Sequence, residues 1–90
     1  MNSNDDVLGR IRAFVFDHFP IAHRRKVSCE SALRAGGIVD PLGVFEIVEY
    51  LENEFDISLH DEDVEGPAFE TLTSLAELVR TKKKHAQRPQ

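Results

Sequence analysis

The sequence has few of the residues and patterns on which several common protein classes depend. Its 90 residues include one cysteine and no tryptophan. Cys29 alone cannot form an internal disulfide or the multi-cysteine site that holds structural zinc, so we expect a reducing, cytoplasmic setting. The apolar runs are only a few residues long, which predicts no membrane span. Residues 1–6 are polar and acidic, unlike the basic start and apolar run of a secretory signal.

Lysine and arginine are absent from the middle third of the chain. Residues 40–65 contain ten acidic side chains and no basic one. Residues 1–39 carry six basic and four acidic residues, and residues 66–90 carry five and two, so the net charge of −5 comes from the middle segment. An acidic surface of this kind repels nucleic acid and attracts basic protein surfaces. We therefore expect basic protein partners and no nucleic-acid binding.

No stretch alternates polar and apolar residues as a half-buried strand does, whereas three stretches have apolar residues at helical spacing. The first covers about residues 5–19 and stops at Pro20. The second covers about residues 41–55, with Asp40 as its N-cap, and the last covers about residues 72–80. The spacing therefore predicts an all-α protein with three long helices.

The remaining segments predict one short helix and two irregular regions. Residues 61–64 are rich in the acids that suit a first helical turn, and Gly66 follows as a stop. Residues 20–39 are rich in Arg, Ser and Gly and are expected to form a long first loop. Residues 82–90 are expected to be a flexible basic tail. We thus expect a monomeric four-helix bundle, with a single domain over residues 1–81.

The residue pattern does not predict an enzyme. The four histidines are far apart in the sequence and have no metal-ligand spacing. Asp61-Glu62-Asp63 lacks the glycine and the ligand alternation of a calcium loop. Gly36-Gly37 lacks the pattern of a phosphate-binding loop. We therefore predict no catalytic residue and no metal site.

The second predicted helix has two faces of different character. At about 100° per residue, one face is apolar and faces the core. The side chains on that face are Val44, Ile47, Val48, Leu51 and Phe55. Leu42 and Phe45 point away from the apolar face, among Glu46, Glu49 and Glu52. An apolar pair one turn apart in an acidic field predicts a surface that binds a basic partner with an apolar hollow.

The chain around this helix resembles the acyl carrier proteins. In that family a turn ending in glycine and an aliphatic residue precedes Asp-Ser-Leu, and an acidic helix ending in Glu-Phe follows. This chain supplies, in matching order, Gly37-Ile38, Asp40, Leu42, Phe45-Glu46, Ile47-Val48, Leu51-Glu52, Glu54-Phe55 and Asp61-Glu62-Asp63. The resemblance covers about residues 5–80, and it is closer to the stand-alone carriers than to a module of a megasynthase.

The resemblance implies a four-helix bundle of the acyl-carrier-protein type, with an acidic second helix that partner enzymes recognise. Those partners would be acyl-transferring, ligating or modifying enzymes of fatty-acid, polyketide or related biosynthesis. Six residues are then expected to bind partners. They are Asp40, Leu42, Phe45, Glu46, Glu49 and Glu52.

One position departs from the family's pattern. Acyl carrier proteins carry a 4′-phosphopantetheine arm on the serine of Asp-Ser-Leu, and Pro41 occupies that place here. Proline has no hydroxyl group, so we expect this chain to carry no arm and no cofactor. Proline suits the first position of a helix, where its missing N–H is not needed, so the helix start is expected to remain intact.

Three interpretations of Pro41 remain open. The chain is a carrier-like protein that lost its attachment site and works by binding partners. Alternatively, it is a genuine acyl carrier protein in which this sequence has a Ser-to-Pro substitution. The third interpretation is an unrelated acidic helical adaptor.

Overall fold

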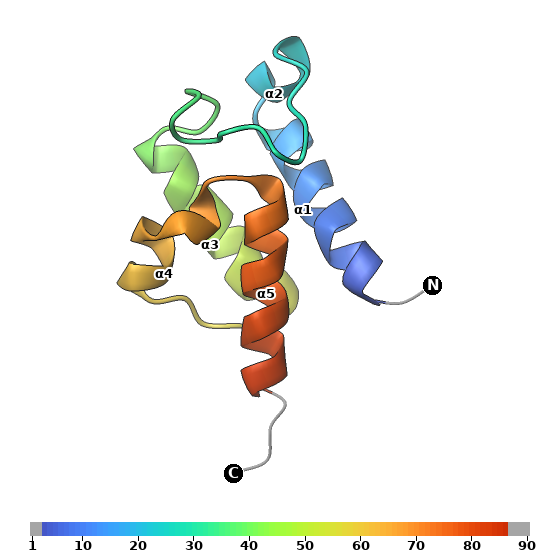
Figure 1. Cartoon of the computed structure of the whole chain (residues 1–90), viewed down its shortest axis with the longest axis vertical. Helices are drawn as coiled ribbons and strands as arrows, with labels where there is room; N and C mark the ends of the chain where they lie inside the picture. Colours follow the sequence, from blue (N-terminus) through green and yellow to red (C-terminus); the bar gives the residue numbers. More distant parts are fainter. Residues whose placement is uncertain (1–2, 87–90) are drawn as a thin grey trace.

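A computed structural model describes residues 3–86 of the chain and the side chains of residues 7–83. Within that range every regular element is helical, so the all-α class predicted from the sequence is confirmed as a small helical bundle. The elements are α1 (Ser3–His18), α2 (Ile21–Arg24), α3 (Pro41–Phe55), α4 (Asp61–Glu65), the 3-10 turn η1 (Pro67–Phe69) and α5 (Leu72–Ala86), as Figure 1 shows.

The core lies where α1, α3 and α5 face one another. Helices α1 and α5 pack side by side, α3 contacts α5, and α4 packs on η1 (Figure 1). All side chains that are buried in the described range are apolar, and the partly buried apolar side chains pack around them. The largest fully buried ones are Phe69, Ile11, Leu33, Ile47, Leu51, Leu72, Leu75, Val15 and Val79. This burial, rather than helix propensity alone, stabilises helices of this length.

Helix α3 has the bounds that the sequence predicts. The Oδ1 atom of Asp40 accepts a hydrogen bond from the backbone N–H of Gly43 at 2.7 Å, as an N-cap does. Pro41 is the first helical residue, where its missing N–H leaves no bond unmade. At the other end Asp56 adopts a left-handed conformation (φ 55°), which stops the helix. Local signals at both ends therefore define α3.

The segment between α1 and α3 is more ordered than the sequence suggests. The sequence assigns residues 20–39 to a loop, but Pro20 precedes a four-residue helix, α2, whose Ala22 is fully buried. The rest of the segment is held by distant backbone groups, since the Leu33 N–H donates to the Glu70 carbonyl at 2.8 Å. Gly37 has φ 76°, a left-handed conformation that glycine adopts without strain.

Helix α5 is longer than the sequence predicts. The apolar spacing ends near Arg80, but the helix continues to Ala86. Residues 82–86, which are predicted from the sequence to belong to a flexible tail, are therefore helical. The Nζ atom of Lys82 lies 2.9 Å from Oδ2 of Asp63 in α4, which ties the helix end to the neighbouring element. Residues 87–90 of the predicted tail lie outside the described residues.

Candidate docking site on α3

Two large apolar side chains stand exposed on the first two turns of α3. Leu42 is 67% exposed and Phe45 is 71% exposed, as the sequence predicts from their place on the helix. They lie one turn apart, so they share one face. A shallow hollow of about 440 Å³ follows this face, lined by Leu42, Phe45, Glu46, Val48, Glu49 and Glu52. The surface thus combines apolar area with carboxylates, which suits a partner that offers both apolar and basic groups.

The three glutamates on this face have different surroundings. Glu49 is exposed and takes part in none of the ion pairs among the described side chains. The Oε1 atom of Glu46 lies 3.9 Å from Nε2 of His18 on α1. Glu52 differs from the other two, because its Oε2 accepts a hydrogen bond from the Leu59 N–H at 2.9 Å. Glu52 therefore fastens the chain that follows α3, in addition to the partner-binding role expected from the sequence.

The start of α3 borders a second hollow of about 410 Å³. Its lining residues are Arg34, Val39, Asp40, Pro41, Val44 and Phe45. Pro41 is exposed here, so a group attached at this position would be reachable from solvent. One oxygen of the neighbouring Asp40 carboxylate is already hydrogen-bonded, because it caps the helix. Phe45 forms a wall of both hollows and is thus the centre of the candidate site.

Sequence reasoning missed Arg34, which supports this hollow. Its guanidinium donates to the backbone carbonyls of Val64 at 3.1 Å and Gly66 at 3.2 Å. These bonds connect the segment before α3 to the end of α4. No sequence pattern predicts these two hydrogen bonds. The acceptors are backbone carbonyls about thirty residues away, and every residue has a backbone carbonyl.

No protein-family model matches this chain, and no solved structure matches it significantly.

We call the six residues predicted to bind partners the α3 docking site; they are Asp40, Leu42, Phe45, Glu46, Glu49 and Glu52. The acidic residues of α4 lie outside this site. The hydrogen bond from Lys82 holds the pKa of Asp63 below its usual value, and a second hydrogen bond from the His60 backbone N–H acts in the same direction. Both bonds favour the charged carboxylate. Asp63 therefore serves to join α4 to α5.

No group of three or more His, Cys, Asp or Glu side chains in residues 3–86 is arranged to hold a metal ion. Cys29 is half-buried and free of disulfide bonding. None of the helices in the described part of the chain is both long enough and apolar enough to cross a membrane.

Proposed function

We propose that this protein is a carrier-like docking protein of fatty-acid, polyketide or related biosynthesis, which binds its enzymes through α3 and bears no phosphopantetheine arm. One observation carries the proposal. Leu42 and Phe45 are exposed beside Glu46 and Glu49, immediately after the Asp40–Pro41 helix start. Covering an exposed apolar pair with a partner removes apolar surface from water and lowers the free energy. Such a pair therefore favours binding of a partner.

Two kinds of side chain contribute to binding at the α3 docking site: apolar ones and acidic ones. Removing Leu42 or Phe45 from water contributes about 1.5–3 kcal/mol each when burial is complete. Glu46 and Glu49 contribute little net affinity, but they attract a basic surface and set its orientation. The expected partner therefore has an apolar hollow with Lys and Arg around it.

Position 41 supports a docking role without covalent loading. A phosphopantetheine arm is joined through a phosphodiester to a serine hydroxyl. The Pro41 ring offers no hydroxyl, so no such bond can form. Asp40 and Leu42, which flank the attachment serine in carriers, are both present.

Loading by a phosphopantetheinyl transferase tests this proposal directly. With coenzyme A and transferase, the protein as it stands keeps its intact mass, whereas Pro41→Ser gains the mass of one arm. Pro41→Ala is the matched control, because it removes the ring without adding a hydroxyl, and its mass stays unchanged. Modification of the unaltered protein would place the arm on another serine and overturn the assignment of position 41.

The same experiment weighs the alternatives. Efficient loading of Pro41→Ser shows that a transferase still recognises α3, which both a genuine carrier with a substitution and a carrier-like relative require. A folded Pro41→Ser protein that is never loaded instead favours an unrelated acidic adaptor. The gene's own sequence then separates the first two interpretations, since serine and proline codons differ by as little as one base.

Binding to a carrier-dependent enzyme tests the surface itself. Glu49→Lys weakens binding and added salt weakens it further, because the attraction is electrostatic. Glu70→Lys is the matched control: it changes the net charge equally at an exposed position outside the α3 docking site. Equal loss of affinity in the two variants would mean that net charge, rather than α3, governs the encounter.

A further inference from the structure

Four consecutive side chains form a basic end on the molecule. His23, Arg24, Arg25 and Lys26 are all exposed, at the end of α2 and just beyond it. None of them takes part in an ion pair with the side chains described for residues 7–83. Their backbone is fixed, because the N–H groups of Arg25 and Lys26 donate to the carbonyls of Ile21 at 2.9 Å and His23 at 3.1 Å. The guanidinium of Arg25 donates to the Gly36 carbonyl at 2.6 Å. We call these four residues the basic α2 end.

An opposite set of charges lies on α4. Asp61, Glu62 and Glu65 are exposed, and no ion pair among the described side chains includes them. Asp63, in the same helix, is satisfied by Lys82 and is excluded from the set. We call Asp61, Glu62 and Glu65 the acidic α4 patch. Asp61, Glu62 and Glu65 are like charges that repel one another, and the same holds for Arg24, Arg25 and Lys26.

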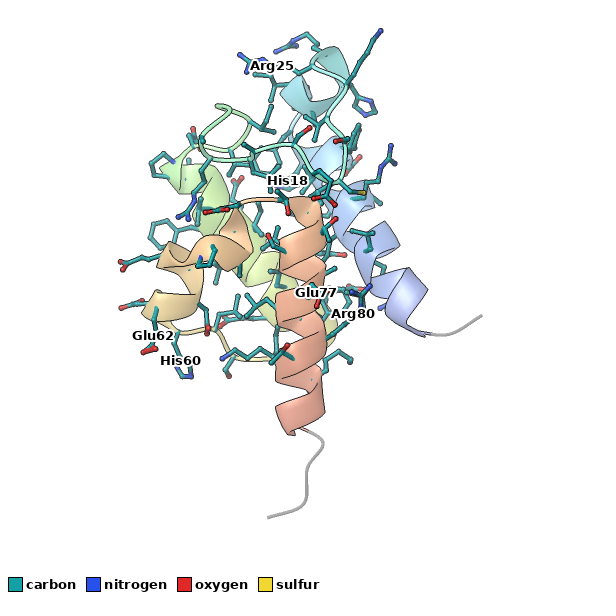
Figure 2. The ribbon with its side chains drawn as sticks, viewed as in Figure 1. His18, Arg25, His60, Glu62, Glu77 and Arg80 are labelled. Atoms are coloured by element: carbon teal, nitrogen blue, oxygen red, sulfur yellow. The ribbon has the colours of Figure 1, made fainter. Side chains whose placement is uncertain are left out.

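The two sets cannot neutralise each other within one molecule. Figure 2 shows Arg25 at the top of the bundle, beside α2, and Glu62 on α4 in the lower half of the bundle, pointing outward. Surface charges more than about 10 Å apart are largely screened from one another by salt. Complementary surfaces of one chain that cannot meet within it can meet between two copies.

We propose that the basic α2 end of one copy binds the acidic α4 patch of a second copy, which departs from the monomer that the sequence predicts. The contact is head-to-tail, because the two surfaces differ, so each bound pair leaves one surface of each kind open. Association therefore extends to short open chains as the protein concentration rises. The contact is weak and reversible, because exposed ion pairs gain little and salt screens them. Because these charges lie outside the α3 docking site, the association holds or fails independently of the function proposed above.

Charge reversal on each side tests the contact. The weight-average mass in sedimentation equilibrium is measured against protein concentration at about 0.05 M and about 0.5 M salt. For the unaltered protein we expect the mass to rise with concentration at the lower salt and to stay at the monomer value at the higher salt. Arg24→Glu/Lys26→Glu and Glu62→Lys/Glu65→Lys each abolish the rise, and far-UV circular dichroism checks that both remain helical.

Mixing the two variants is the decisive measurement. Each variant alone presents two surfaces of like charge, whereas a mixture of the two offers opposite charges at every contact and regains the rise in mass. Combining all four substitutions in one chain restores the native net charge and also restores self-association. Lys83→Glu is the control for Arg24→Glu, since it changes the net charge equally at the far end of α5 and leaves the association intact.

Three results would overturn the proposal. The first is an unaltered protein that stays monomeric at the lower salt up to its solubility limit. The second is a folded Arg24→Glu/Lys26→Glu protein that associates as the native chain does. The third is a mixture of the two folded variants that stays monomeric. If the double variants do not fold, the single variants Arg24→Glu and Glu62→Lys are mixed instead, with the same readings.

Discussion

The two faces of α3 share one backbone and have opposite surroundings. On the inner face, Ile47 and Leu51 are almost completely buried against α5 and the rest of the core. On the outer face, Leu42 and Phe45 are about two-thirds or more exposed. Residues of the same chemical type therefore have different consequences: a leucine stabilises the fold on one face and is available for a partner on the other.

Truncating one leucine on each face should give the largest difference in the free energy of unfolding between the two faces. Leu51→Ala removes a fully buried side chain and lowers the free energy of unfolding by about 2–5 kcal/mol, because it loses apolar burial and leaves a cavity. Leu42→Ala, on the outer face of the same helix, changes it by less than about 0.5 kcal/mol. Urea unfolding monitored by circular dichroism measures both. Similar losses for the two variants would mean that Leu42 is covered in solution.

Glycine-to-alanine substitutions in α3 and α1 compare a tightly packed backbone position with an open one. A Cβ atom at Gly43 would lie 2.8 Å from Cε1 of Phe19 and 3.0 Å from Cγ1 of Val39, so the ring would have to move. We expect Gly43→Ala to lower the free energy of unfolding by about 1 kcal/mol, since overpacking outweighs the gain in helix propensity. Gly9→Ala in α1 meets no atom within 4 Å. It should raise the same free energy by up to about 1 kcal/mol.

The charged residues provide a third test, at Asp63 and Glu49. The folded pKa of Asp63 lies below its unfolded value because of the Lys82 hydrogen bond, so its stabilisation is present above about pH 4. That stabilisation is lost as the pH falls through the lowered pKa. Asp63→Asn should therefore lower the free energy of unfolding at neutral pH by about 0.5–1 kcal/mol.

The pH profile distinguishes this ion pair from a general charge effect. Between about pH 6 and pH 3, the difference in stability between Asp63→Asn and the native chain should shrink. Glu49→Gln is the control on the outer face of α3, where no ion pair among the described side chains stabilises the carboxylate. A difference for Asp63→Asn that does not change with pH would show that the ion pair contributes nothing.

Phe45→Ser is the prediction with the smallest effect on the fold. The side chain is 71% exposed, so its loss should change the free energy of unfolding by less than about 0.5 kcal/mol. Binding to a carrier-dependent enzyme should fall by more than tenfold, because an exposed aromatic residue buried at the centre of an interface contributes about 2 kcal/mol or more. Calorimetric titration of the enzyme measures the affinity. Unchanged affinity would remove Phe45 from the α3 docking site.

The differences between prediction and structure follow from the range of the interactions. Helix α2 has four residues, too few to display a helical period, and it is held because Ala22 is buried. The end of α5 carries no apolar signal beyond Arg80, yet the Lys82 ion pair joins it to α4. Glu52 was expected to face partners only, and its bond to the Leu59 N–H depends on how the chain turns after α3.

Features that depend on neighbouring residues can be predicted from the sequence alone. Asp40 and Pro41 define the start of α3, the helical period places Leu42 and Phe45 outside, and the composition of residues 40–65 makes that surface acidic. These signals are local, so they can be read along the chain. The bonds from Arg34 to the end of α4, and the separation of the charged side chains of α2 from those of α4, arise only in the folded chain. Those outcomes depend on the relative placement of distant segments, which burial of the shared core sets and no local pattern specifies.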